Sequence, residues 1–271
     1  MTRSAVQDQA EYGSVAGEAP LSTRTDDIGI ADGINVASLV AKNRPVKGIM
    51  ALTERPLAGI ITLKKAGYTS PADLNGKTIG ITGDPSDRPI TKWIIDQGGG
   101  DYGSAKIVTI GFNGVTNLES GKVNAFTGFF PADGVQVQVD GYPTTIFRLD
   151  EYKAPSYPGL VVFSTDQRIQ EKPGVMKAFV DATVHGYEDT LKNPQQSLND
   201  LLAENRTLKR KLQAAQLQAF MPLFQGSAPH YGVFEEKTID AFGSWLVRVG
   251  LLKSPFTLDR FATNQFLPAS G

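Results

Sequence analysis

Residues 46–83 read VKGIMALTERPLAGIITLKKAGYTSPADLNGKTIGITG, and they contain three short apolar runs separated by polar or glycine-rich segments. A fourth run, DIGIADG, precedes them at residues 27–33. Near-continuous apolar runs of this length are typical of buried parallel strands whose two faces are both covered by helices. The run at residues 57–63 is followed by a loop and a new strand–helix series. We therefore predict that the chain crosses there from one α/β lobe to a second.

The pattern around this crossover predicts two lobes. Strands are expected at residues 46–52, 77–82, 106–110, 123–129, 144–149 and 160–164, and helices at residues 34–43, 90–97, 113–120, 134–139, 194–204, 208–224 and 235–249, with a further helix opening at Pro173. The run at 160–164 is the expected return crossover. This predicts a discontinuous first lobe (residues 1–62 plus 163–271) and an inserted second lobe (residues 63–162), with a ligand between them at the strand ends. A doubly wound single domain is the alternative.

The composition excludes several classes of protein. Of the 271 residues, 41% are hydrophobic, which is enough apolar material for buried cores. The formal net charge of -1 predicts no nucleic-acid-binding surface, and no apolar run approaches the ~18 residues needed to span a membrane. The absence of cysteine excludes thiol nucleophiles, disulfides and cysteine-ligated metals. We expect neither a metal nor a cofactor.

The two histidines form no enzymatic motif. His185 lies in a predicted helix and His230 in a predicted loop, and neither has a carboxylate at the spacing of a zinc-protease motif. The G-x-S-x-G turn of serine hydrolases is also absent. We therefore predict a binding protein and not an enzyme.

Polar residues at two helix starts of the second lobe are candidate ligand contacts. Residues 83–87 (GDPSD) follow a predicted strand and open a helix, whose N–H groups and dipole favour an anion or a polar ligand edge. Ser86 and Asp87 are the candidates in that turn, and Asn113 has the same position after the next strand. The alternative is that these residues only cap their helices.

Phe129 and Phe130 are adjacent aromatic residues at the end of a predicted strand. Because side chains alternate across a strand, both rings cannot point into one core, so one is expected to face the cleft and stack on a flat ligand. Asp133 follows them and supplies a carboxylate. The alternative is that both rings pack in the core.

In the first lobe, candidate ligand contacts lie just past the predicted strand ends: Asp32, Asn35, Thr53 and Arg55. Arg55 is suited to a bidentate contact with a carboxylate, sulfonate or phosphate, although an exposed structural role is the alternative. Asp32 has a helix cap as its alternative role. Tyr157, in the sequence PSYP at the return crossover, is expected to close over the ligand or to stiffen the hinge.

Several stretches together resemble the periplasmic solute-binding proteins of ABC importers: DIGIADG, residues 51–83, GFNGVTNLESGKVNAF (111–126), DEYKAPSYPGLVVFSTD (150–166) and FATNQFLP (261–268). The branch they resemble holds nitrate, sulfonate, taurine and thiamine-precursor (hydroxymethylpyrimidine) binders. The resemblance implies a type II periplasmic-binding-protein fold that captures a small planar or anionic solute, such as a pyrimidine, a sulfonate, nitrate or an aromatic acid. It also implies a periplasmic location, importer membrane subunits as partners and no catalysis.

Within this family, the pyrimidine binders resemble the chain around residues 129–133. In those proteins a run of tyrosines, an asparagine and an acid occupy the corresponding positions. The resemblance therefore implies ring stacking by Phe129 or Phe130 and a ligand contact from Asp133. This chain differs by lacking the hydroxyl groups and by having Pro131. Related folds include a hydroxymethylpyrimidine synthase, which is the enzymatic alternative, but its chemistry is tied to a cysteine-rich motif.

The N-terminal residues depart from the family. Residues 1–12 (MTRSAVQDQAEY) are polar and lack the apolar core of a signal peptide. In the family, a strand and a helix precede the helix that residues 13–26 match. The resemblance therefore implies a first lobe that is N-terminally truncated and less stable than the second, with a truncated non-transport relative as an alternative function.

Overall fold

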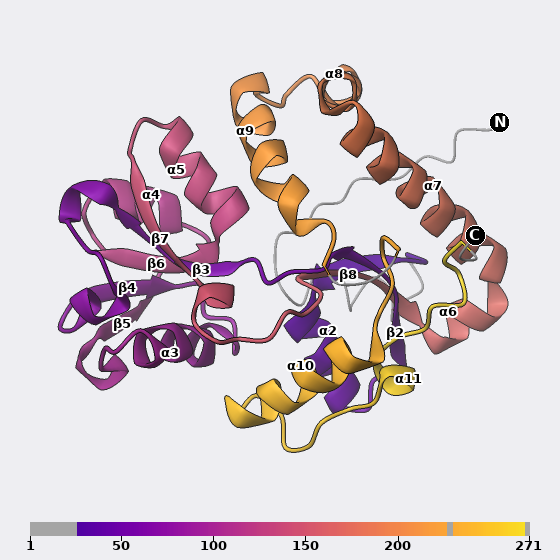
Figure 1. Ribbon diagram of the computed structural model, residues 1–271, viewed down its shortest axis with the longest axis horizontal. Coiled ribbons are helices and arrows are strands. Elements are labelled where there is room, and N and C mark those ends of the chain that lie inside the picture. Colours follow the sequence, from indigo (N-terminus) through magenta and orange to yellow (C-terminus); the bar gives the residue numbers. More distant parts are fainter. Residues whose placement is uncertain (1–25, 227–229, 269–271) are drawn as a thin grey trace.

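The computed structural model describes residues 26–226 and 230–268 (Figure 1). Its strands are β1 (Gly29–Asp32), β2 (Val46–Thr53), β3 (Ala58–Leu63), β4 (Thr78–Ile81), β5 (Lys106–Thr109), β6 (Ala125–Phe129), β7 (Thr144–Arg148) and β8 (Leu160–Thr165). The α-helices are α2 (Gly33–Ala41), α3 (Asp87–Gln97), α4 (Gly114–Glu119), α5 (Val135–Val139), α6 (Asp166–Glu171), α7 (Pro173–Lys192), α8 (Pro194–Glu204), α9 (Arg210–Phe220), α10 (Glu236–Arg248) and α11 (Leu258–Phe261). Every strand and helix expected by pattern is present, with ends that differ by a few residues.

The strands form two separate sheets that lie side by side in Figure 1. One has the order β1-β8-β2 and the other the order β5-β4-β6-β3-β7. The chain therefore changes sheet within residues 54–57 and again within residues 149–159. This is the mixed α/β architecture that the sequence predicted, while the lobe boundaries at residues 62 and 163 stay a prediction.

The direction of most strands differs from the expectation of parallel pairing. β8 is antiparallel to both β1 and β2, and β3 is antiparallel to both β6 and β7. Among the strands of the described residues, β4 is the one that pairs in parallel, with β5 and β6. The expectation was wrong because an unbroken apolar run reports burial of both strand faces and carries no information on the direction of the hydrogen-bonded neighbour.

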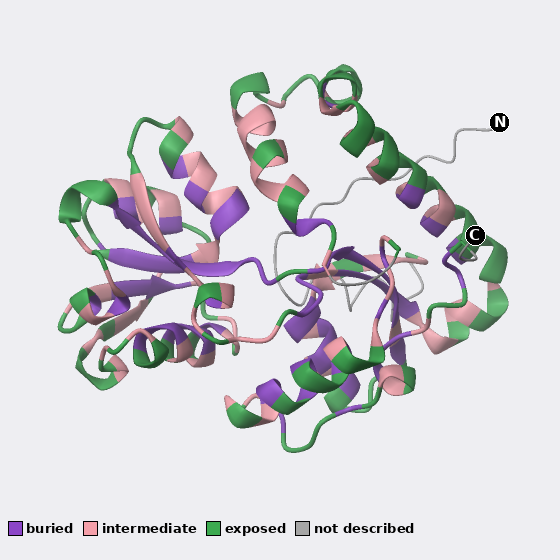
Figure 2. Cartoon of the chain, viewed as in Figure 1, coloured by how far each residue is buried: buried purple, intermediate pink, exposed green. Residues whose placement is uncertain are grey.

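Helices bury both faces of the three-stranded sheet. Along β8, Val161 and Phe163 point to the side of α2 and α10, whereas Val162 points to the side of α7, as the two-residue period of a strand requires. On the first side the core comprises Ile34, Val36, Ala37, Val40, Ile239, Phe242, Leu246 and Phe261; on the second it comprises Ile49, Met50, Leu52, Met176, Val180 and Val184. Figure 2 shows these strands buried and the outer side of α7 exposed.

The five-stranded sheet is covered in the same way. Ile60 and Ile79 pack with α3 through Ile90, Ile94 and Ile95 on one face. On the other face, Ile61 and Phe126 pack with Leu118 of α4 and Val137 of α5. A π-helix, Phe130–Gly134, links β6 to α5 and was not expected from the sequence. This π-helix begins at Phe130, the second of the two phenylalanines.

Helix α9 contacts the helices that cover the five-stranded sheet. It packs against α5 and the π-helix, and it has no fully buried residue of its own. Lys211 Nζ donates to the carbonyl of Val139 and Gln216 Nε2 to that of Ala132, each at 3.3 Å. This contact joins the C-terminal helices to the five-stranded body near the end of β6 (Figure 1).

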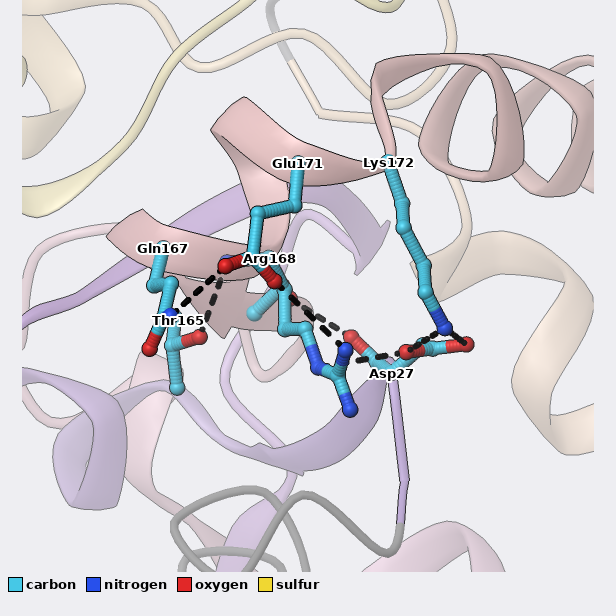
Figure 3. Close-up of polar contacts among 7 residues, drawn as sticks. Asp27, Thr165, Gln167, Arg168, Glu171 and Lys172 are labelled. Atoms are coloured by element: carbon cyan, nitrogen blue, oxygen red, sulfur yellow. Dashed lines mark hydrogen bonds and ion pairs between the residues drawn. The ribbon is translucent and has the colours of Figure 1, made fainter.

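A group of ion pairs fixes the beginning of the described chain. The Asp27 carboxylate accepts from Lys172 Nζ at 2.8 Å and pairs with Arg168 Nε at 3.3 Å (Figure 3). Arg168 lies in α6, where Thr165 Oγ1 caps the helix by accepting from the Arg168 N–H at 3.1 Å. These contacts hold the residues before β1 against the start of α6 and α7.

β1 forms one edge of the three-stranded sheet. Within the described residues, β1 pairs only with β8, and Ile30 on it is 51% exposed. The expectation of an N-terminally truncated lobe concerns residues 1–25, which lie outside the described residues. Among the described helices, none is both long and apolar enough to cross a membrane.

Candidate functional site

The carboxyl ends of three neighbouring strands meet at one edge of the five-stranded sheet. Because β5, β4 and β6 run in parallel, the turns after them lie side by side. The turn after β4 reaches the first sheet's helices, where a cavity of about 80 Å³ lies between the two bodies. Its lining includes Asn35 and Lys42 from α2, Asp84 and Ser86 from the turn, and Leu246 from α10.

Asp84 lines this cavity, and its charge and that of Asp87 act on Asp32 of the other body. Asp32 ends β1, and its Oδ1 accepts from the Ile34 N–H at 2.7 Å, so it caps α2. Burial, with a smaller contribution from the negative charges of Asp84 and Asp87, raises the pKa of Asp32 to about 7. The structure shows the helix-capping alternative for Asp32, while its contact with a ligand stays a prediction.

In the turn after β4, some polar groups form hydrogen bonds within the turn, and others line the cavity. Asp87 Oδ2 accepts from Thr82 Oγ1 at 2.7 Å, from the Gly83 N–H at 2.9 Å and from the Asp84 N–H at 3.1 Å. Burial raises the pKa of Asp87 despite these bonds. Ser86 Oγ donates to Asp84 Oδ1 at 2.6 Å. Ser86 and Asp87 thus hold the turn in its shape.

Asp84 is the residue that sequence reasoning missed in this turn. Its Oδ2 is buried and accepts no hydrogen bond from the described residues. Such an acceptor costs free energy until a donor reaches it. The sequence GDPSD contains two acids, and nothing in the spacing tells which of them completes the turn and which keeps an open acceptor.

The candidates that follow β2 lie at the first change of sheet. Thr53 is buried, and its Oγ1 accepts from the Leu160 N–H at 2.9 Å, which ties β2 to β8. Arg55 is exposed. Glu54 between them is buried, with its carboxylate accepting from the Gly226 N–H at 2.6 Å and the Gly232 N–H at 3.2 Å. Glu54 was not predicted, because a buried acid has no sequence signature.

Phe129 and Phe130 pack where the two bodies touch. Phe130 is 8% exposed, contacts Leu57 and Leu223, and has the Arg148 guanidinium 4.4 Å from its ring centre. Phe129 is half-buried against the same cluster. Asp133 Oδ2 accepts from the Phe129 N–H at 2.8 Å, and burial raises the pKa of Asp133. Cleft stacking by these rings stays a prediction.

Tyr157 lies in the core behind Asp32. It stacks on Phe242, with ring centres 4.5 Å apart and planes at 11°, and on Trp245 at 5.6 Å and 20°. Burial raises the pKa of its phenol well above the usual range, and the charge of Asp32 adds to this. A Cβ on Gly33 would lie 2.0 Å from the Pro158 carbonyl oxygen, so glycine permits the close contact between the β1–α2 turn and this connection.

Asn113 lies in the turn after β5 and is exposed. It occupies the N-cap position of α4 without a side-chain cap bond, and its Nδ2 donates only a long bond to the Ile110 carbonyl at 3.3 Å. Of the candidates, Asn35 and Ser86 line the cavity, and Asp32 and Asp87 directly follow the lining residues Ala31 and Ser86 in the chain. The other candidates lie at the connections, at the π-helix or on the neighbouring turn.

Two α/β bodies joined by two connections, with polar turns meeting between them, define a two-lobed binding fold. The "NMT1/THI5 like" family model matches residues 8–197, so the chain belongs to the NMT1/THI5-like family. The chain is 28% identical to a formylaminopyrimidine-binding protein of Halalkalibacterium halodurans over 220 residues, which cover 79% of this chain and 67% of that protein. It is 26% identical over 253 residues to a 4-amino-5-hydroxymethyl-2-methylpyrimidine phosphate synthase of Legionella pneumophila, covering 90% of this chain and 76% of that protein.

Solved structures confirm the periplasmic-binding-protein fold. The periplasmic aliphatic sulphonate binding protein SsuA of Escherichia coli superposes with a TM-score of 0.71 at 13% identity, covering 92% of this chain and 84% of that one. The Candida albicans CA3427 gene product, described as having the generic periplasmic binding protein fold, superposes with a TM-score of 0.68 at 15% identity, covering 96% and 86%.

Proposed function

We propose that the chain is the solute-binding component of an ABC importer, and that it captures a small planar solute bearing N–H donors, such as a thiamine-precursor pyrimidine. The family and the formylaminopyrimidine-binding relative support this role. In this proposal the two sheets belong to two lobes, and residues 54–57 and 149–159 form the hinge. The importer's membrane subunits are the partners, and the periplasm is the location.

The observation that carries the proposal is the buried, open Asp84 Oδ2 at the cavity, where the charges of Asp84 and Asp87 also act on Asp32. Asp32 belongs to one lobe, and Asp84 and Asp87 belong to the other. An ionised carboxylate only accepts hydrogen bonds, and an amino-substituted heterocycle presents N–H donors in the plane of its ring. A ligand of that kind would satisfy the open Asp84 Oδ2 and would reduce the repulsion among the three acids.

The cavity requires movement before it admits a ring. Its volume of about 80 Å³ is well below the ~300 Å³ at which ligand pockets begin. The lobes therefore have to separate at the two connections to admit a heterocycle and then close over it.

An anionic solute, such as a sulfonate, is the second candidate, favoured by the fold shared with sulphonate receptors. Lys42 lines the cavity, and Arg55 is exposed at the first connection. However, the Gly83 and Asp84 N–H groups at the turn already donate to Asp87. An anion at this turn would also face the charge of the acids.

A synthase-like enzyme has less support, although two relatives carry that name. The chain contains no cysteine for the motif to which the resemblance ties that chemistry. His185 is exposed on α7, with its Nδ1 2.8 Å from the Asp181 carbonyl oxygen. These features favour binding without chemistry.

A ligand screen tests the proposal. Thermal unfolding is measured with 4-amino-5-hydroxymethyl-2-methylpyrimidine and with an alkanesulfonate as the anionic comparison. At a concentration ~100 times its dissociation constant, a ligand stabilises the folded chain by about 2.7 kcal/mol. We expect that effect from the pyrimidine, and stabilisation by the sulfonate alone would overturn the proposal.

A further inference from the structure

We infer that Phe112 is the aromatic surface on which the planar solute stacks, and hence a residue that determines specificity. This inference rests on the proposed function, because it concerns how the same cleft recognises the face of its ligand. Phe112 lies in the turn between β5 and α4, and it is 69% exposed. From the sequence, ring stacking was predicted for Phe129 or Phe130 and not for Phe112.

Two other aromatic residues near the strand ends, Phe130 and Tyr157, already have partners for their rings. Phe130 is buried between the Leu57–Leu223 cluster and the Arg148 guanidinium. Tyr157 is fully buried in a stack with Phe242 and Trp245. A ring that stacks on an incoming solute needs an open face, and the exposure of Phe112 provides one.

The backbone around Phe112 fixes this exposure. Gly111 has φ +59°, a left-handed conformation that turns the chain sharply as it leaves β5. A Cβ on Gly114 would lie 2.4 Å from the Phe126 ring, so glycine lets the other end of the turn sit directly on the core. Phe112 is therefore held outward by a turn that is anchored on both sides.

The Phe112 turn neighbours the carboxylate turn. The Ile110 N–H donates to the Ile81 carbonyl at 2.8 Å, which continues the parallel β4–β5 pairing to the ends of both strands. A Cβ on Gly83 would lie 3.1 Å from Thr109 Cγ2, so the two turns start in contact. Neighbouring turns at the carboxyl end of the sheet thus carry an apolar ring and hydrogen-bond acceptors, which match the apolar face and the polar rim of an aminopyrimidine.

The test compares two ligands that both carry N–H donors, of which only one contains an aromatic ring. Dissociation constants are measured by calorimetry for 4-amino-5-hydroxymethyl-2-methylpyrimidine and for acetamidine, which is flat and small but not aromatic. Phe112→Ala is expected to weaken pyrimidine binding about tenfold and to change acetamidine binding by less than about twofold. Phe112→Tyr keeps the ring and should restore pyrimidine affinity.

Tyr142→Ala is the matched control. Tyr142 is 37% exposed and precedes β7, at the opposite edge of the same sheet, so its removal should leave both affinities unchanged. If the wild-type chain binds the pyrimidine and Phe112→Ala binds it equally well, this inference is wrong while the proposed function stands. If the wild-type chain does not bind the pyrimidine, both are wrong.

Discussion

Trp93 on α3 and Trp245 on α10 meet edge to face, with ring centres 5.8 Å apart and planes at 90°. Because α3 packs on the five-stranded sheet and α10 on the three-stranded sheet, this contact joins the two bodies. Trp93 Nε1 donates to the Tyr152 carbonyl at 2.7 Å, and Tyr157 stacks on Trp245. The return connection is thus held between the two tryptophans and the core.

Trp245→Ala should therefore destabilise the whole chain. Trp245 is 2% exposed, and a large-to-small change of a buried aromatic costs about 3–5 kcal/mol of unfolding free energy. Denaturant unfolding measures the loss, with Tyr142→Ala as an exposed aromatic control that should stay within about 0.5 kcal/mol of wild type. A Trp245→Ala variant as stable as the control would show that the contact contributes little.

The two acids of the turn after β4 should respond differently to the same change. Asp87→Asn weakens three hydrogen bonds to a buried carboxylate and should lower the unfolding free energy by about 1–3 kcal/mol. Asp84→Asn leaves those bonds intact, so its effect should appear in affinity for the aminopyrimidine and not in stability. The pair is compared by denaturant unfolding and calorimetry, and a stability loss that is equal in both would contradict the division of roles.

The stability of the chain should depend on the protonation of Asp32. Its folded pKa of about 7 lies above the ordinary value of ~3.9, so the folded chain binds this proton more tightly than the unfolded chain. The stabilisation is fully present below about pH 4 and is lost as the pH rises through about 7. Asp32→Asn should flatten this decline, with a residual slope from Asp87 and Asp133, whose pKa values burial also raises.

Asp73 is a control whose effect on the pH dependence of stability has the opposite sign to that of Asp32. Hydrogen bonds from the Thr69 and Ser70 N–H groups lower the pKa of its carboxyl, so it stabilises the chain above its ordinary pKa and loses that effect as the pH falls. Asp73→Asn should therefore remove a rise in stability with pH, where Asp32→Asn removes a decline. Unfolding curves of Asp32→Asn that run parallel to wild type at every pH would refute the role of Asp32.

Amide hydrogen exchange should distinguish the two sheets. Within the described residues β1 has a single strand partner, and Ile30 is half exposed on it, whereas β4 is paired on both sides. We expect faster exchange in β1 and β2 than at Ile79 and Ile81, because fewer contacts have to break for local opening. Slower exchange in β1 and β2 would rule out a less stable first lobe.

Hydrophobic patterning by itself determined the sequence of elements. The runs that became β2, β3 and β8 are largely apolar and are buried at nearly every position, because helices or a second body cover both of their faces. Pro173 and Pro194 marked the first turns of α7 and α8, where a missing N–H costs nothing. Such signals are local, so a single sequence contains them.

The roles of the site residues were decided only by the tertiary structure. Ser86 and Asp84 belong to one short turn, yet the hydrogen bonds that leave Asp84 Oδ2 open depend on how that turn folds. The ring of Phe130 is covered by Arg148 and by Leu223, which lies 93 positions later in the chain. Burial, charge and ring exposure at the cleft arise from contacts between segments distant in sequence, and strand periodicity carries no record of them.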